Sequence, residues 1–366
     1  MKDSQKIIFM ARALKLAEKA SGKTSPNPMV GAVIVKNGKI VGEGYHKRAG
    51  KAHAEIEAIK KAGQNTRGAE MFVNLEPCCH HGKTAPCVDA ILLAGIKKVY
   101  VGMTDPNKLV YRKGIGVLRK GGVEVEVGIL KNKCELLNES FVKFIRTGNP
   151  FVIMKSGISL DGKIATNLGE SQWITCEKSR KLVHEMRGKV DAILVGSGTV
   201  IKDDPKLTVR LNRRGFKNPI RVILDRRSRI AINSKVFENA DRNKVIYVTS
   251  PKLSKEKEKR LRDIGVDILV LENKRKRIKL ETLLKELGKR DIVNVLIEGG
   301  SELNASALKE NIVDKAILFV APIIIGGNKA PGFIGGDGTL KLKDVVRLKN
   351  IESKKVGDDL MIEGYF

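Results

Sequence analysis

One pair of short segments constrains this chain more than any other feature. His53-Ala54-Glu55 is followed by Pro77-Cys78, and eight residues separate Cys78 from Cys87. One imidazole and two thiolates are typical ligands of a tetrahedral zinc ion that keeps its fourth position open. The fold must therefore bring His53, Cys78 and Cys87 to one point from separate elements. Glu55 is not needed as a ligand, so it is available to move protons.

These groups indicate hydrolytic deamination of a ring carbon that carries an amino group. In that reaction the metal activates a water molecule, and a glutamate carries the proton of the water to the leaving ammonia. We therefore predict His53, Cys78 and Cys87 as zinc ligands and Glu55 as a catalytic residue. The alternative is a closed structural site that also uses Cys79, which would have no use for Glu55.

The gap between the two thiols is longer than the two-residue gap of nucleic-acid deaminases. It contains His80, His81 and Lys83. Such polar groups suit a small phosphorylated substrate. For His80 the alternative is a histidine at the surface that contacts no ligand.

Length and composition favour two domains and a cytoplasmic location. The chain has 366 residues, which is more than one ordinary core holds. It has no apolar run long enough to span a membrane, and the amphipathic N-terminus does not resemble a secretory signal. Five cysteines are too few for a disulfide framework in a chain of this size. We expect Cys134 and Cys176 to be ordinary structural residues.

The formal net charge of +28 could attract nucleic acid. However, charges of both signs are spread along the chain, and aromatic residues that could stack on bases make up only 4%. We expect the basic run at residues 272–277 to be a solvated loop. A deaminase of nucleic-acid bases with a basic C-terminal binding domain remains the alternative function.

Apolar periodicity and turn residues predict an α/β domain in the first half. A helix through residues 7–17 should end at Ser21-Gly22, a second should run from His53 to near Gly63, and a third should follow Pro86. Asn37-Gly38 predicts a hairpin. The expected strands are 29–35, 39–43, 70–75 and 97–102.

A helix expected over residues 132–146 is followed by the turn Thr147-Gly148-Asn149-Pro150, where we place the domain boundary. The domains are then 1–146 and 150–366, the second also α/β. Its expected strands are 151–156, 192–195, 221–224, 244–248, 267–271, 294–297 and 315–320. Its expected helices are 178–186, 254–262, 280–287 and 302–309.

Ordered motifs along nearly the whole chain resemble one family, the bifunctional riboflavin-biosynthesis deaminase/reductases of the RibD type. In the first half the motifs are Ser25-Pro26-Asn27-Pro28, Gly44-Tyr45-His46, His53-Ala54-Glu55, Glu76-Pro77-Cys78 and Asp105-Pro106-Asn107. In the second half they are Ser159-Leu160-Asp161-Gly162-Lys163, Trp173-Ile174-Thr175, Asp203-Asp204-Pro205 and Glu298-Gly299-Gly300.

The resemblance implies a cytidine-deaminase-like three-layer domain followed by a dihydrofolate-reductase-like domain. The first would use Zn²⁺ to deaminate 2,5-diamino-6-ribosylamino-4(3H)-pyrimidinone 5′-phosphate. The second would use NADPH to reduce the ribosyl side chain, giving 5-amino-6-ribitylaminouracil 5′-phosphate. The implied partner is this small phosphorylated pyrimidine, with no nucleic acid or membrane, and we expect a homo-oligomer, either a dimer or a tetramer.

The resemblance also assigns roles to residues that match its motifs. In the deaminase half it implies that the substrate is bound by Asn27, His46, His80, Lys83, Asp105 and Asn107. In the reductase half it implies catalytic roles for Lys155 and Asp161, and substrate binding by Ser171, Arg187, Leu207, Arg210 and Glu298. The implied NADPH-binding residues are Gly157, Trp173, Thr199, Asp203, Gly300 and Ser301.

Some of these positions also have simpler explanations. Gly299-Gly300 could be only a turn, and Trp173 could be a core residue. Lys108, Tyr111 and Arg112 depart from the family pattern and predict a differently shaped substrate loop. Two further alternatives are a zinc-stabilised binding protein without activity and a chain in which only one half is active. No Gly-x-Gly-x-x-Gly follows a strand, which disfavours an ordinary Rossmann cofactor site.

Overall fold

The computed structural model describes residues 1–80, 85–108, 110–211, 216–271 and 278–366. The chain divides into two compact units, Met1–Gly148 and Asn149–Phe366, which we describe separately. No helix in the described part of the chain is long and apolar enough to cross a bilayer. The basic run at residues 272–277 lies outside the described residues.

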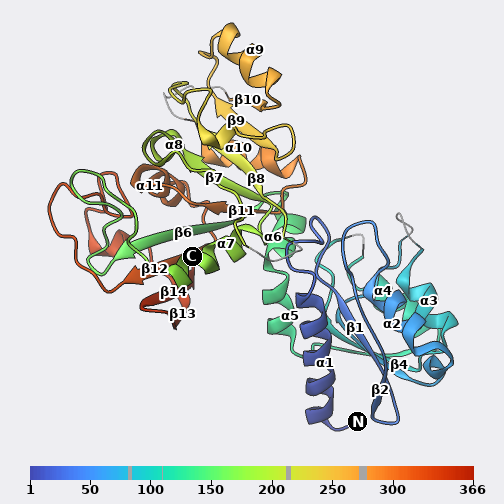
Figure 1. The fold of residues 1–366 in the computed structure, drawn as a ribbon. Coiled ribbons are helices and arrows are strands. Elements are labelled where there is room, and N and C mark those ends of the chain that lie inside the picture. Colours follow the sequence, from blue (N-terminus) through green and yellow to red (C-terminus); the bar gives the residue numbers. More distant parts are fainter. Residues whose placement is uncertain (81–84, 109, 212–215, 272–277) are drawn as a thin grey trace. The chain divides into compact units, whose positions relative to one another are not determined.

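The first unit contains a five-stranded sheet in the order β2-β1-β3-β4-β5 (Figure 1). β1 and β2 form the antiparallel hairpin predicted from Asn37-Gly38, and both turn residues have positive φ, as that turn requires. β3 pairs antiparallel with β1 and parallel with β4, and β4 pairs parallel with β5. The strands are β1 (Gly31–Lys36), β2 (Lys39–Tyr45), β3 (Glu70–Leu75), β4 (Lys98–Met103) and β5 (Glu124–Val127).

Helices cover both faces of this sheet. On one face, α1 and α5 pack Phe9, Leu14 and Cys134 against the sheet, so the structural role predicted for Cys134 is confirmed. On the other face, α2, α3 and α4 contribute Ala58, Ile91 and Leu118 to a second core. The helices are α1 (Asp3–Glu18), α2 (Ala54–Ala62), η1 (Gly63–Thr66), α3 (Cys87–Leu93), α4 (Lys113–Lys120), α5 (Lys131–Leu137) and α6 (Glu139–Thr147).

The prediction of a single helix over residues 132–146 is wrong. The chain forms two helices, α5 and α6, which are separated by Asn138. The Asn138 side chain accepts a hydrogen bond from the Met29 N–H at 2.8 Å and donates one to the Met29 carbonyl at 3.0 Å. This tertiary contact spans 109 residues and overrides the local helical pattern.

The second unit contains a nine-stranded sheet in the order β10-β9-β8-β7-β11-β6-β12-β14-β13. Neighbours from β10 to β12 are parallel, and β14 and β13 continue the sheet as antiparallel strands. The strands are β6 (Phe151–Ser159), β7 (Ala192–Gly196), β8 (Ile220–Leu224), β9 (Val245–Thr249), β10 (Asp267–Val270), β11 (Asn294–Ile297), β12 (Lys315–Ala321), β13 (Lys349–Val356) and β14 (Asp359–Tyr365).

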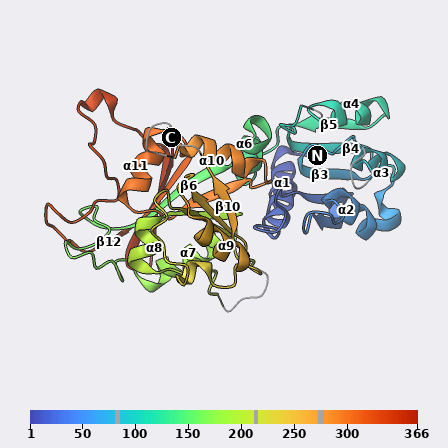
Figure 2. The same cartoon turned by 90° about the horizontal axis from the view of Figure 1, so that it is seen from above.

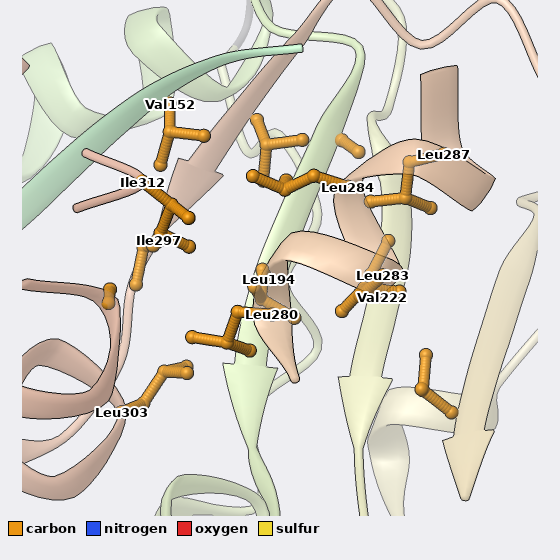
Figure 3. Close-up of a cluster of buried hydrophobic side chains, with 14 of the residues drawn as sticks. Val152, Leu194, Val222, Leu280, Leu283, Leu284, Leu287, Ile297, Leu303 and Ile312 are labelled. Atoms are coloured by element: carbon orange, nitrogen blue, oxygen red, sulfur yellow. The ribbon is translucent and has the colours of Figure 1, made fainter. Parts of the chain in front are cut away.

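Helices also cover both faces of the second sheet, with α10 and α11 on one side and α7, α8 and α9 on the other (Figure 2). Figure 3 shows the first of these cores, in which Leu280, Leu283 and Leu287 of α10 face Leu194 and Val222 of the sheet. The helices are α7 (Glu177–Arg187), α8 (Ser197–Asp203), η2 (Lys235–Phe237), α9 (Lys255–Asp263), α10 (Leu280–Gly288), α11 (Ser301–Lys309) and η3 (Leu342–Asp344).

The strands predicted from sequence are all present, with limits that shift by at most three residues. Three strands, β5, β13 and β14, and two helices, α4 and α8, were not expected. β13 was missed because seven of its eight residues are exposed, so its sequence lacks an alternating apolar pattern.

Candidate functional site

The three predicted zinc ligands lie together in the first unit. His53 precedes the first residue of α2, Cys78 follows β3, and Cys87 begins α3. The His53 Nδ1 atom is 3.1 Å from the Cys87 Sγ atom and 3.6 Å from the Cys78 Sγ atom. One ligand atom from each of the three residues lies within 4.8 Å of the others. The expected convergence of the three ligands is therefore observed.

The donor set fits zinc, because zinc in proteins is held mainly by imidazole nitrogen and thiolate sulfur. The hydrogen bond between the two thiols lowers the pKa of Cys78 and raises that of Cys87, and the nearby His53 also favours the Cys78 thiolate that binds metal. Cys79 is not part of the cluster. Within the described residues the site thus has three ligands, which disfavours the closed four-ligand alternative.

Glu55 is buried beside the three ligands, with a relative exposure of 3%. Burial, followed by the charge of Cys78, raises the pKa of the Glu55 carboxyl. A carboxyl group whose pKa is raised holds a proton more readily, as a group that accepts a proton and then releases it must. Glu55 therefore has the position and the electrostatic environment of a proton carrier.

Asn27 and His46 form a connected pair at the same site. The His46 Nδ1 atom lies 3.1 Å from the Ala52 carbonyl, and its Nε2 atom lies 3.2 Å from the Asn27 Nδ2 atom. This pattern fits a neutral imidazole that donates through Nδ1 and accepts through Nε2. Burial lowers the pKa of His46, which also favours the neutral form. The His46 and His53 rings are in edge contact, with centroids 5.4 Å apart.

The other predicted substrate ligands of this half are only partly described. Asp105 is buried, and burial raises its pKa to about 6. Its Oδ1 atom accepts a hydrogen bond of 2.8 Å from the Asn107 N–H, which holds the two residues in one turn. His80 is exposed, and its charge acts on Asp105. Lys83 lies outside the described residues.

The second unit contains a cavity of about 670 Å³, which is within the usual range for a small-molecule site. Six of the predicted reductase residues line it: Lys155, Gly157, Ser171, Trp173, Arg187 and Arg210. The Trp173 side chain is 64% exposed and its ring lies 4.6 Å from the Arg180 guanidinium. The alternative of a core tryptophan is therefore wrong.

A buried carboxylate organises two cations at this cavity. Glu298 accepts hydrogen bonds from Arg187 Nε at 2.7 Å and Arg187 Nη2 at 2.9 Å, and Lys155 Nζ lies 3.0 Å from its Oε2 atom. Although burial opposes ionisation of Glu298, the charges of Arg187 and Lys155 lower its pKa well below the ordinary value. Both oxygens of Glu298 are thus engaged by protein groups.

The other predicted reductase residues, Glu298 included, are not among the residues that line the cavity. The Leu207 side chain is buried in a core cluster. The Asp161 carboxylate accepts hydrogen bonds from the Ser159 hydroxyl and from the backbone N–H groups of Ile325 and Gly326. Its oxygens therefore connect the end of β6 to the segment after β12.

The four other predicted cofactor residues make three contacts beyond the carboxyl ends of β7 and β11. The Thr199 hydroxyl lies beside the Cα of Gly300, where a Cβ atom would be 3.7 Å away. Asp203 accepts a hydrogen bond of 3.3 Å from Ser171, which does line the cavity. The Ser301 hydroxyl donates to the Gly332 carbonyl. All four residues therefore belong to the segments that follow β7 and β11.

The sequence did not reveal four polar residues of α7 that line the cavity, Glu177, Arg180, Lys181 and His184. Together with Arg187 they lie on one side of α7, at helical spacing. The His184 Nδ1 atom accepts a hydrogen bond of 3.3 Å from the Arg210 N–H. Burial, followed by Arg187 and Arg210, lowers the pKa of His184 to about 4. The spacing on α7 places these residues on one side of the helix, but nothing in the sequence distinguishes that side from a solvated polar face.

Comparisons with known proteins agree with both halves. A model of the RibD C-terminal domain matches residues 150–362, and a model of the cytidine and deoxycytidylate deaminase zinc-binding region matches residues 3–103. The riboflavin biosynthesis protein RibD of Actinobacillus pleuropneumoniae is 42% identical over 97% of this chain and 94% of its own length. The chain belongs to the RibD family.

Solved structures of RibD proteins have the same fold. A structure of Acinetobacter baumannii RibD matches with a TM-score of 0.90 and 37% identity, over 100% of this chain and 99% of that one. A Thermotoga maritima protein, described as a diaminohydroxyphosphoribosylaminopyrimidine deaminase/5-amino-6-(5-phosphoribosylamino)uracil reductase, matches with a TM-score of 0.88 and 37% identity, over 99% of each chain. The two-domain α/β fold class predicted from sequence is confirmed.

Proposed function

We propose that this RibD-family chain catalyses two consecutive steps of riboflavin biosynthesis. It deaminates 2,5-diamino-6-ribosylamino-4(3H)-pyrimidinone 5′-phosphate and then reduces the ribosyl side chain with NADPH. The observation that carries the proposal is the presence, in one chain, of a three-ligand zinc cluster beside a buried glutamate and a separate cation-lined cavity. We assign residues 1–146 to the deaminase and residues 150–366 to the reductase.

In the deaminase half, His53, Cys78 and Cys87 hold the zinc ion, whose Lewis acidity makes a water molecule nucleophilic near pH 7. Glu55 accepts one proton from the attacking water and delivers it to the amino nitrogen as the bond from that nitrogen to the ring carbon breaks. Water is thus consumed and ammonia is released. Asn27, His46, Asp105 and Asn107 orient the pyrimidine, and His80 and Lys83 bind the ribose phosphate.

In the reductase half, NADPH supplies the hydride. Lys155, held by Glu298 and exposed to the cavity, lies by the reacting sugar, and we retain Asp161 as its catalytic partner on the strength of the family resemblance. Ser171, Arg187, Leu207, Arg210 and Glu298 shape the substrate site. Arginine suits a phosphate because its guanidinium donates two parallel hydrogen bonds. Gly157, Trp173, Thr199, Asp203, Gly300 and Ser301 bind the cofactor.

We also infer a homo-oligomer, a dimer or tetramer, that binds no nucleic acid. The edge strand β13 and the segment before it expose several apolar side chains, Leu340, Leu342, Val346 and Ile351. An exposed sheet edge with apolar residues favours association with a second copy. Light scattering after size-exclusion chromatography measures the mass directly; a monomer across the micromolar range contradicts this inference.

A coupled assay on the full chain tests the proposed function. The purified zinc-loaded protein should release ammonia from the diaminopyrimidinone phosphate and then oxidise an equal amount of NADPH. Ammonia release from transfer RNA and not from the free pyrimidine would favour the nucleic-acid alternative. Glu55→Gln should retain zinc and lose deamination, while Glu57→Gln on the same helix is the matched control. Turnover by Glu55→Gln at the wild-type rate would exclude the proposed mechanism.

A further inference from the structure

A buried carboxylate outside the predicted site connects the segment that leads into Cys78 to the chain that follows β4. Glu76 lies between β3 and the ligand Cys78, and it is 3% exposed. Its Oε2 atom accepts hydrogen bonds from the N–H groups of Asp105, at 3.2 Å, and Arg112, at 3.0 Å. Its Oε1 atom accepts one from the Ile115 N–H at 3.2 Å. All three donors belong to the chain that follows β4.

These contacts satisfy backbone N–H groups of Asp105 and at the start of α4. Arg112 is the residue before α4, and its side chain makes no capping hydrogen bond. It also has a positive φ of 57°, so the chain enters the helix by a sharp turn. The first N–H groups of a helix need acceptors, and a negative group is favoured there by the helix dipole. Glu76 supplies that acceptor from a different part of the sequence.

The backbone packing around Glu76 leaves little freedom. The Glu76 N–H donates to the Met103 carbonyl at 2.9 Å, which fixes the segment to the end of β4. A Cβ atom on Gly114 would lie 2.2 Å from the Pro77 carbonyl oxygen. The first turn of α4 therefore lies directly on the peptide that leads into Cys78. Only glycine at position 114 lets the two backbone segments approach this closely.

Resting on the proposed function, we propose that Glu76 is a positioning residue for the deaminase substrate. Asp105 is one of its three hydrogen-bond partners, and Asn107 is held to Asp105 by a further hydrogen bond. Glu76 thereby sets the distance between the ligand Cys78 and the side chains of Asp105 and Asn107, which we assign to pyrimidine binding. It touches neither substrate nor metal and acts through the loop.

Glu76→Gln tests this role because it keeps the size of the side chain but turns one acceptor into an N–H donor that faces a backbone N–H. Loss of a hydrogen bond to a charged group is expected to raise the KM for the diaminopyrimidinone phosphate by about tenfold. The zinc content should stay at the wild-type value, and kcat should change by less than about threefold. Amide hydrogen exchange should become faster at Asp105, Arg112 and Ile115.

Three comparisons separate the possible outcomes. Gly114→Ala keeps the Glu76 carboxylate but displaces the same helix turn, because the added Cβ atom would lie 2.2 Å from the Pro77 carbonyl oxygen and 3.4 Å from Glu76 Oε1. It should raise the same KM. Glu43→Gln removes a carboxylate that pairs with Arg12 elsewhere in the unit and should leave KM unchanged. NADPH oxidation with the deaminated intermediate should be unchanged in all three variants.

Wild-type KM in Glu76→Gln, or loss of zinc or of the fold in that variant, overturns the positioning role. Loss of zinc or of the fold would mean that Glu76 supports the segment that carries Cys78 and does not position the loop after β4. Failure of the wild-type protein itself to release ammonia is a different result, because it contradicts the proposed function before any variant is compared.

Discussion

Arg187 and Glu298 form a bidentate ion pair at the wall of the reductase cavity, with N···O distances of 2.7 and 2.9 Å. The pair joins the last residue of α7 to the residue that follows β11. Lys155 from β6 shares the same carboxylate. Three separate elements therefore converge on one buried negative charge, and the position of the Lys155 ammonium depends on it.

Glu298→Gln should destabilise the second unit and impair the reductase. Removing one partner of a buried ion pair leaves uncompensated charge, which typically costs about 3–5 kcal/mol. The only tryptophan, Trp173, lies in this unit, so its fluorescence during urea unfolding measures the effect. NADPH oxidation should fall more than tenfold, and ammonia release should be unchanged.

The control for this change is Glu281→Gln, which removes an exposed partner of Lys285 on the surface of α10. Exposed pairs at this spacing contribute only about 0.3–0.5 kcal/mol. If Glu298→Gln is no less stable than Glu281→Gln, then Glu298 does not organise the cavity as its hydrogen bonds indicate.

Zinc stoichiometry should distinguish a thiol of the three-ligand cluster, Cys87, from Cys79, which lies outside it. Cys87→Ser removes a ligand, so the bound zinc should fall from about one per chain to near zero, and deamination should be lost. Cys79→Ser should keep the bound zinc and the deamination activity, because Cys79 is outside the three-ligand cluster. Metal analysis of the purified variants provides the measurement. Loss of zinc in Cys79→Ser, with full retention in Cys87→Ser, would reverse the assignment.

The metal site could be predicted from sequence because each of its residues has few other uses in such a motif. His53, Cys78 and Cys87 are brought together as the spacing indicated, and Glu55 is buried beside them. In the second unit, Lys155, Trp173 and Arg210, to which the family resemblance assigns roles, line one cavity. The resemblance was needed there, because isolated lysines and arginines in a basic chain carry no signal of their own.

What the sequence missed depends on contacts between distant residues. Asn138 ends a helix because it binds the Met29 backbone, 109 residues away. The Glu76 contacts with Arg112 and Ile115 span 36 and 39 residues and leave no periodic pattern. On α7, His184 looks like part of a solvated polar face until the cavity is known. Such roles become visible only when the segments are placed in space.

Leu283→Ala should destabilise the second unit through its largest core. Leu283 is fully buried between α10 and the sheet. Truncating a buried leucine to alanine costs about 2–5 kcal/mol, because apolar contact is lost and a cavity remains. Urea unfolding followed by Trp173 fluorescence checks this value. Leu168→Ala, at a 99% exposed side chain, is the control and should change stability by less than about 0.5 kcal/mol.

The stability of the second unit should fall as the pH decreases, partly because of His184. Burial and the neighbouring arginines lower the pKa of folded His184 to about 4, whereas the unfolded value is near 6.5. Between these values the unfolded chain binds a proton that the folded chain does not, so the free energy of unfolding decreases as the pH falls from 6.5 towards 4. His184→Gln removes this contribution and no other titrating group.

The measurement for His184 is the difference in unfolding free energy between the wild type and His184→Gln at pH 7.5, 6 and 5, again followed by Trp173 fluorescence. That difference, wild type minus variant, should become smaller or more negative at each step to lower pH, because only the wild type loses the His184 contribution. Comparing the two proteins cancels the titration of groups that they share. A difference that grows as the pH falls would mean that His184 is protonated in the folded state, and that the Arg210 N–H is not its hydrogen-bond donor.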